Sequence, residues 1–260
     1  MWLMDVEARK KMVKIYGHRG SKGDYPENSM LAFKKAIEAG VAGMELDIHM
    51  TKDGELVVIH DETLERTTTG AGYVKDYTLA EIRTLSAGAK FTEFKHYTPC
   101  WDDELVPTLM EVLMLCKAHD LEVNIELKTH LIPYAGIEEK MLEVVNASGY
   151  NPAKMIYSSF HLPTLLRIQK LDQSVKVVWL LKTMVSLPHD YMDTLGFESL
   201  HVNKDVVMSN LDFWKPIADK LRVWTVNAEA EIEALIDLGV SAIITDYPEL
   251  AVKLQIGSQR

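Results

Sequence analysis

The chain has 260 residues, 47% of them hydrophobic and 25% charged, which is typical of a globular protein with a sizeable core. Its net charge of −10 argues against nucleic-acid binding, which needs a basic surface, and means that local positive groups would have to attract any anionic substrate. The charged N-terminal stretch lacks the apolar core of a secretory signal, and no apolar run reaches the roughly 18 residues of a membrane span. The two cysteines fit no metal or redox spacing. We therefore expect a cytoplasmic protein.

Short β-type runs alternate with amphipathic helical stretches along the chain. The predicted strands cover Val13–His18, Gly43–Thr51 (with Leu56–His60 after it), Leu121–Lys128, Lys154–Phe160, Ser174–Leu181, Ser199–Asn203, Arg222–Asn227 and Ala242–Asp246. The predicted helices cover Ser29–Ala39, Leu109–His119, Gly136–Ser148, Leu162–Lys170, Leu211–Lys220, Glu229–Leu238 and Pro248–Leu254, with a further one near Pro188–Leu195. Strict alternation predicts a parallel sheet with helical crossovers, and about eight such units favour a closed (β/α)₈ TIM barrel over an open sheet. No Gly-x-Gly-x-x-Gly follows the first strand, so the dinucleotide-binding open sheet lacks its main signal.

One long segment, from about residue 62 to residue 106, interrupts this alternation. It is polar and irregular, with one short helical piece at Leu79–Leu85. A connection of this length is usually functional, and it leaves from the carboxyl end of the second strand, the face that carries the active site in a barrel. We therefore expect a small insertion subdomain or cap within a single domain that covers residues 1–260.

The stretch that follows Gly43 predicts a metal site. Side chains alternate along a strand, so Glu45 and Asp47 share one face while Leu46 and Ile48 occupy the other. Two neighbouring carboxylates repel each other, and burying them without a partner is costly. A hard divalent cation such as Mg²⁺ or Ca²⁺ removes that cost because it prefers oxygen ligands. A solvated strand edge is the usual alternative, but it is weakened here because both faces of a parallel strand should be buried.

Other strand ends supply the remaining groups. Glu126 and Lys128 share a face by the same two-residue period, so Glu126 would complete a three-carboxylate site and Lys128 would pair with a phosphate oxygen. Arg19, just past the first strand, offers a planar fork for two phosphate oxygens. The imidazoles of His18 and His60 lie at strand ends on either side, as general acid–base catalysis of phosphate-ester cleavage requires.

Each of these residues alone has a simpler explanation, since a single histidine at a strand end is more often structural. Their convergence from three strands favours function. His49 shares the face of Glu45 and Asp47, but an oxygen-ligand cation has little use for imidazole, so we expect a structural or supporting role for it. We expect the other histidines to be background: His96, His119, His130, His161, His189 and His201. Of the later tryptophans, only Trp224 is expected to line the pocket.

Taken together, the motifs resemble those of the glycerophosphodiester phosphodiesterases. They are Gly17-His18-Arg19-Gly20, Pro26-Glu27-Asn28-Ser29, Glu45-Leu46-Asp47, Thr51-Lys52-Asp53-Gly54, Val58-Ile59-His60-Asp61, Asn124-Ile125-Glu126-Leu127-Lys128, Trp224-Thr225-Val226-Asn227 and Thr245-Asp246-Tyr247-Pro248. The resemblance runs from about Val13 to Leu254. Any single motif would be weak, but the set in this order is highly specific.

The resemblance implies a (β/α)₈ barrel with an insertion after the second strand. It also implies one divalent cation, Mg²⁺ or Ca²⁺, at the positions of Glu45, Asp47 and Glu126, and catalysis by His18 and His60. Phosphate contacts would come from Arg19 and Lys128, with Glu27 near the site. The implied reaction releases sn-glycerol 3-phosphate and an alcohol: a glycerol hydroxyl attacks phosphorus, and water opens the resulting cyclic phosphate.

Three alternatives remain open at this stage. Four aromatic residues of the insertion (Phe91, Phe94, Tyr97 and Trp101) would suit either an acyl chain, as in a lysophospholipase D-type enzyme, or a small core of the insertion itself. A barrel that only binds its ligand should have lost some of the catalytic set, which is intact here. A metal-dependent barrel aldolase or isomerase would leave the two histidines without a role. The expected partner is a small-molecule glycerophosphodiester; the sequence does not indicate an oligomeric state.

Overall fold

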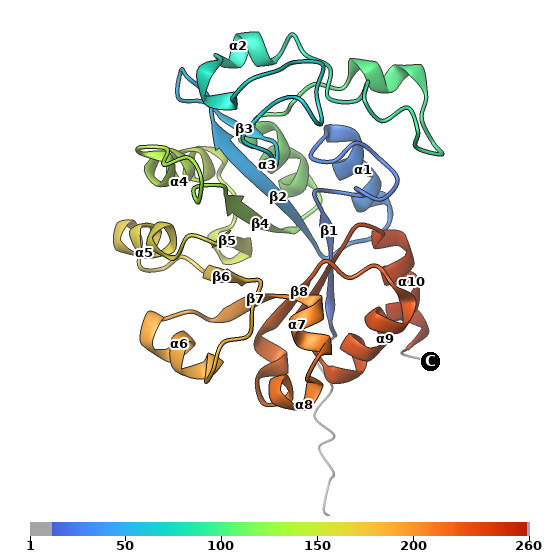
Figure 1. Cartoon of the computed structure of the whole chain (residues 1–260), viewed down its shortest axis with the longest axis vertical. Helices are drawn as coiled ribbons and strands as arrows, with labels where there is room; N and C mark the ends of the chain where they lie inside the picture. Colours follow the sequence, from blue (N-terminus) through green and yellow to red (C-terminus); the bar gives the residue numbers. More distant parts are fainter. Residues whose placement is uncertain (1–11, 259–260) are drawn as a thin grey trace, which may run out of the picture.

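The computed structural model describes residues 12–258 and contains a closed barrel of eight parallel strands (Figure 1). The barrel strands are β1 (Lys14–His18), β2 (Gly43–Met50), β4 (Glu122–Leu127), β5 (Met155–Ser159), β6 (Val177–Leu181), β7 (Ser199–Asn203), β8 (Leu221–Trp224) and β9 (Ala242–Thr245). They neighbour one another in chain order, and β1 pairs with both β2 and β9, which closes the barrel. A short strand, β3 (Leu56–Val58), pairs antiparallel with β2. The predicted TIM barrel is confirmed.

Helices surround the strands and cover their outward faces (Figure 1). They are α1 (Met30–Glu38), α3 (Leu109–Ala118), α4 (Ile137–Ser148), α5 (Leu162–Leu171), α6 (Pro188–Leu195), α7 (Lys204–Met208), α8 (Leu211–Trp214), α9 (Glu229–Leu238) and α10 (Pro248–Gly257). Residues such as Leu46 and Ile125 point from the sheet into this layer, where they pack in one large cluster with Phe33 and Leu113. Every second residue therefore faces the barrel interior.

The lower part of the interior is closed by side chains. Tyr16, Ile156, Val178, Ala242 and Ile244 form a separate apolar cluster there. Below this cluster, the Tyr16 hydroxyl donates a hydrogen bond to Glu122, and the Arg222 guanidinium lies 5.1 Å from the centre of the Tyr16 ring. The apolar cluster therefore closes the barrel interior between the carboxyl ends of the strands and their amino ends, where a separate hollow of about 190 Å³ is lined by Glu122 and Arg222.

One predicted helix differs from the structure late in the chain, and one helix there has no counterpart in the prediction. The expected helix over Leu211–Lys220 is instead the short α8 followed by a 3₁₀ turn over Lys215–Lys220, with Ile217 outside helical geometry. The cause is Pro216, which has no N–H to donate and favours the break. A further helix, α7, begins directly after β7 and was not predicted; Asn203 caps it by accepting a hydrogen bond from the Asp205 amide at 2.9 Å.

The insertion after β3 packs against the side of the barrel (Figure 1). It contains the helix α2 (Leu79–Ile82) and the 3₁₀ turns Val74–Asp76 and Pro99–Asp103. The Arg83 guanidinium binds Glu111 of α3 through two hydrogen bonds of 2.7 and 2.9 Å, and Glu104 accepts the Leu31 amide of α1. These contacts dock the insertion on α1 and α3, while Arg66 in its first part also donates hydrogen bonds to Asp61 and Glu27.

The apolar core of the insertion continues into the barrel. Leu64, Val74, Ile82 and Val106 cluster with Val57, which belongs to β3 and so to the sheet. Because the two parts share buried side chains, we propose that the insertion and the barrel are one domain.

Candidate active site

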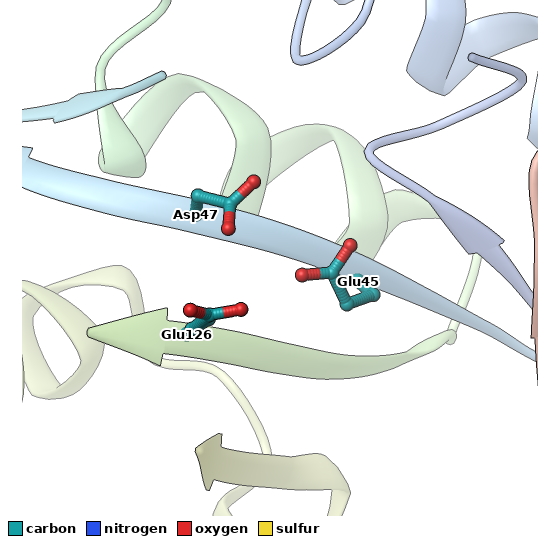
Figure 2. Close-up of side chains that lie close together, drawn as sticks. All are labelled: Glu45, Asp47 and Glu126. Carbon is teal, nitrogen blue, oxygen red and sulfur yellow. The ribbon is translucent and has the colours of Figure 1, made fainter. Parts of the chain in front are cut away.

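Three carboxylates meet where β2 and β4 run side by side. The register pairs Asp47 with Glu126 and sets Glu45 beside Asn124, so all three acidic side chains face the interior (Figure 2). One oxygen from each carboxylate lies within 4.8 Å of the others, and all three residues are buried. Figure 2 shows Glu45 and Asp47 projecting from β2 toward the space that Glu126 enters from the neighbouring strand.

Two positively charged side chains, Arg19 and Lys128, contact this group of carboxylates. The Arg19 Nε lies 3.1 Å from Asp47 Oδ2, and its Nη1 donates to Glu27 at 2.8 Å. The Lys128 Nζ donates to Glu126 Oε1 at 2.8 Å and lies 3.6 Å from Asp47 Oδ1. Asn28 donates to the other oxygen of Asp47 at 3.0 Å. With three carboxylates against two cations, the centre has one negative charge too many for a dry interior.

The pKa values report that imbalance. Burial, and then the neighbouring Asp47, raise the pKa of Glu45 well above its ordinary value. Burial also raises the pKa of Glu126, with Lys128 opposing it. For Asp47, burial would raise the pKa, but Arg19 and Lys128 outweigh it and lower the value. One carboxylate is therefore ionised while its two neighbours resist ionisation, a state that a bound divalent cation would resolve.

The two predicted histidines flank this centre in matching ways. The His18 Nδ1 lies 2.6 Å from Asp246 Oδ1, and its Nε2 lies 4.0 Å from Glu45. The His60 Nδ1 lies 2.6 Å from Asp61 Oδ1, and its Nε2 lies 3.1 Å from Lys128 Nζ. Each imidazole thus has a carboxylate behind Nδ1 and presents Nε2 to the centre. Burial, followed by the positive Arg19, lowers the pKa of His18 to about 4, and burial also lowers the pKa of His60.

A cavity of about 290 Å³ opens above these groups. One side of it is lined by His18, Arg19, Glu45, His60, Glu126 and Lys128. The rest of the lining combines apolar and aromatic residues, including Phe160, Leu180 and Trp224, with polar residues that include the charged Glu62 and Lys182. The structure therefore brings together, in one cavity, the predicted histidines, two predicted cations and two of the predicted carboxylates, with Asp47 directly behind. Trp224 lines the cavity as predicted.

Glu27, the other predicted pocket residue, does not line this cavity. Its carboxylate accepts hydrogen bonds from Arg19 and, at 2.8 Å each, from two nitrogens of Arg66. Arg66 also donates to Asp61. Glu27 therefore connects the two sides of the site from behind and fixes the direction of the Arg19 side chain.

Sequence reasoning missed several residues that support or line the site. Asp61 and Asp246 stand in motifs quoted above, but the sequence analysis assigns them no role. For Asp61, its place directly after His60 was the available signal. His130 and His201, which the sequence analysis expects to be background, both line the cavity. The signal for His201 was a polar face on a buried parallel strand, Ser199–His201–Asn203. His49 is structural, as expected: its ring nitrogens lie 2.8 Å from the Tyr134 hydroxyl and 3.0 Å from the His60 carbonyl.

The aromatic residues of the insertion lie away from the cavity. The Phe94 and Tyr97 rings pack edge-on against Trp101, which is buried, and Phe91 packs against Phe94. Of residues 62–106, the cavity lining includes Glu62. These aromatic side chains are therefore a core of the insertion and do not extend the pocket. Across residues 12–258, no helix is both long and apolar enough to cross a membrane.

Comparison with known proteins agrees with this geometry. A family model described as the glycerophosphoryl diester phosphodiesterase family matches residues 18–250. The chain is 39% identical over 241 residues to a glycerophosphodiester phosphodiesterase of Caldanaerobacter subterraneus, covering 92% of this chain and 96% of that protein. It is 38% identical to one of Bacillus altitudinis, covering 94% and 98%.

Solved structures are similar over nearly the whole chain. A phosphodiesterase of Oleispira antarctica, in complex with the product sn-glycerol-3-phosphate, superimposes with a TM-score of 0.82 at 26% identity, covering 96% of this chain and 98% of that one. A glycerophosphodiester phosphodiesterase of Thermotoga maritima gives a TM-score of 0.73 at 28% identity, covering 93% and 98%.

Proposed function

The chain belongs to the glycerophosphoryl diester phosphodiesterase family, and from this premise we propose that it hydrolyses glycerophosphodiesters to sn-glycerol 3-phosphate and an alcohol, with one divalent cation and two histidines. The observation that carries the proposal is the arrangement of two carboxylate-backed imidazoles around three converging carboxylates in a single cavity. The product-bound relative from Oleispira antarctica supports a small phosphate-containing substrate.

The residues fit a hard divalent cation. All three candidate ligands offer carboxylate oxygens, and Asp47 Oδ1 is a buried atom without a hydrogen-bond partner. Glu45, Asp47 and Glu126 would hold Mg²⁺ or Ca²⁺, which both accept oxygen ligands. When bound, the cation supplies positive charge for the non-bridging phosphate oxygens. With all three carboxylates ionised, the cation would change the formal charge of the centre, counted with Arg19 and Lys128, from −1 to +1, which favours an anionic substrate in a protein of this net charge.

Arg19 and Lys128 would bind the phosphate. Both are buried or nearly so and already lie against the acidic centre, so little side-chain freedom is lost when they meet phosphate oxygens. The guanidinium offers two parallel donors, and Glu27 restrains it from behind. These donors would stabilise the additional negative charge as phosphorus becomes five-coordinate.

The two imidazoles would divide the proton transfers. One Nε2 accepts the proton of the glycerol hydroxyl that attacks phosphorus, and the other gives a proton to the departing alcohol oxygen. The cyclic phosphate formed is then opened by water, with the proton transfers reversed. Asp246 and Asp61 accept from Nδ1–H, so it is Nε2 of each ring that faces the cavity for this exchange, and that of His60 would give up its contact with Lys128 to a substrate group.

The alternatives lose support from the structure. A lysophospholipase D-type activity rested on the aromatic residues of the insertion, which pack on one another instead. A binding module without catalysis would not need two oriented histidines. No specific observation favours either.

The test is release of glycerol 3-phosphate from glycerophosphocholine, glycerophosphoethanolamine and glycerophosphoglycerol by the chelated protein and after adding back Mg²⁺, Ca²⁺ or Mn²⁺ singly. We expect activity only with metal, and His18→Ala and His60→Ala to be folded and inactive. Full activity after chelation, or near-wild-type turnover by either variant, would refute the mechanism.

A further inference from the structure

One part of the cavity, next to the apolar cluster around Tyr16, is lined by side chains that the proposed chemistry does not use. We define the cavity floor as Asn124, Leu180, His201 and Ile244, which line the cavity and are almost wholly buried. His201 lies on β7 between Leu200 and Val202, which both pack outward among the helices, so its ring enters the barrel interior. Trp224, on the next strand, lines the same cavity.

The floor and the neighbouring Trp224 carry polar atoms without hydrogen-bond partners. Neither Nδ1 nor Nε2 of His201 has a hydrogen bond within the described chain, although the residue is wholly buried. The same holds for Trp224 Nε1 and for Asn124 Oδ1. Buried polar groups are nearly always satisfied, so this concentration in one cavity indicates a ligand with hydrogen-bonding groups of its own.

His201 binds rather than transfers protons. Burial, and then the positive Arg222 beside it on β8, hold the pKa of His201 well below its ordinary value, so the ring is neutral. A neutral imidazole offers one donor and one acceptor, and the Trp224 indole offers a donor only. No carboxylate backs the His201 ring among the described residues, in contrast to His18 and His60.

This donor and acceptor set fits an uncharged hydroxyl group. A hydroxyl donates one hydrogen bond and accepts two, so it can donate to an imidazole nitrogen while it accepts from an indole N–H. A phosphate or carboxylate oxygen could not donate and would leave that acceptor nitrogen unsatisfied. A cationic head group finds no carboxylate in the floor.

Resting on the proposed function, we infer that His201 of the floor and the Trp224 Nε1–H beside it bind the terminal hydroxymethyl group of the substrate's glycerol. The glycerol then occupies the buried end of the cavity, beneath the phosphate contacts of Arg19 and Lys128. The departing alcohol faces the open end, which is lined by exposed residues such as His130 and Leu131. The floor thus selects for glycerol, while the head group is held loosely.

The experiment compares two substrates that differ only in the inferred contact. Glycerophosphocholine carries the terminal hydroxymethyl group; 2-hydroxyethyl phosphocholine lacks it but keeps the hydroxyl that attacks phosphorus. We expect the metal-loaded wild type to prefer glycerophosphocholine in kcat/KM by about 10-fold or more, as for a site left with unpaired buried groups by the smaller substrate. His201→Leu should reduce that preference about 10-fold, mainly through KM, and His201→Gln should restore part of it.

A second variant covers the case in which His201→Leu does not fold. Trp224→Phe keeps an aromatic ring, although a smaller one, at a partly exposed position and removes the indole donor, and the same loss of preference is expected. Equal losses for both substrates in these variants would mean a structural or water-binding role and would overturn the inference. An unchanged preference would also overturn it. Failure of the wild type to cleave glycerophosphocholine would instead refute the proposed function.

Discussion

Replacement of Asp246 by asparagine tests whether the carboxylate behind His18 is part of the catalytic unit. The Asp246 carboxylate lies 2.6 Å from His18 Nδ1, and its second oxygen accepts a hydrogen bond from Asn227 at 2.8 Å. Burial would raise the pKa of Asp246, but contact with His18 lowers it to about 2, so it is ionised at neutral pH. An amide has nearly the same shape but no charge, and it can hold the imidazole in the wrong tautomer.

We expect Asp246→Asn to lower kcat/KM about 10³-fold, which is about 4 kcal/mol of transition-state free energy. Asp61→Asn should cost less, about 10²-fold, because His60 is 30% exposed against 11% for His18, and water can replace the lost partner. The assay is glycerol 3-phosphate release at saturating metal, with far-ultraviolet circular dichroism as the folding control. Asp212→Asn, exposed on α8, is the matched variant and should behave as wild type.

A folded Asp246→Asn protein with turnover within about threefold of wild type would refute this reasoning, because general acid–base transfer alone is worth more. If Asp246→Asn and Asp61→Asn lowered kcat/KM by the same factor, the different burial of His18 and His60 would have no effect on the contribution of their carboxylate partners.

Three further predictions concern the metal, acid stability and the barrel interior. Mg²⁺ or Ca²⁺ at 100 times its Kd should raise the unfolding free energy of the wild type, measured by calorimetry, by about 2.7 kcal/mol. Glu126→Gln should lose most of this gain, and an equal gain in the variant and the wild type would exclude Glu126 as a ligand. Although burial opposes it, Arg66 and Arg19 lower the pKa of Glu27 from 4.5 to about 2, so this carboxylate stabilises the fold above pH 4.5 and the stabilisation is lost as pH falls toward 2. In urea titrations, Glu27→Gln should therefore lower the unfolding free energy by up to about 3 kcal/mol at pH 7 and leave it unchanged near pH 2. A decrease that does not depend on pH would contradict this linkage. Gly43→Ala should destabilise by about 1–3 kcal/mol because its Cβ would lie 2.4 Å from the Tyr16 ring, whereas Gly257→Ala, with no atom within 4 Å, should not.

The barrel and the centre of the site follow from local patterns in the sequence. Strand alternation placed Glu45 and Asp47 on one face, and parallel pairing then sets Glu126 beside Asp47 with no further information. His18 follows by the same logic, because β1 and β2 are neighbours and pair it with Glu45. These residues could be predicted because their positions depend only on the two-residue alternation of side chains along a strand and on the order of the strands in the chain.

Other features depend on contacts that no local pattern contains. Asp246 meets His18 only because β9 closes the barrel against β1, across 228 residues of sequence. The insertion docks through Arg83 and Glu104 on two helices, and its aromatic residues gave no sign of whether they faced the cavity or one another. The sequence does not single out His201, because a histidine without a nearby partner in the sequence is usually structural. That its two ring nitrogens lack hydrogen-bond partners becomes visible only in three dimensions.

The apolar cluster around Tyr16 makes the cavity a dead end. Tyr16, with the apolar side chains around it, blocks passage toward Glu122, so substrate and both products must share one doorway. The alcohol nearest that doorway should depart before water enters, and glycerol 3-phosphate should escape last. Glycerol 3-phosphate is therefore expected to compete with substrate for the empty enzyme, while added alcohol should trap the cyclic phosphate and return it to diester.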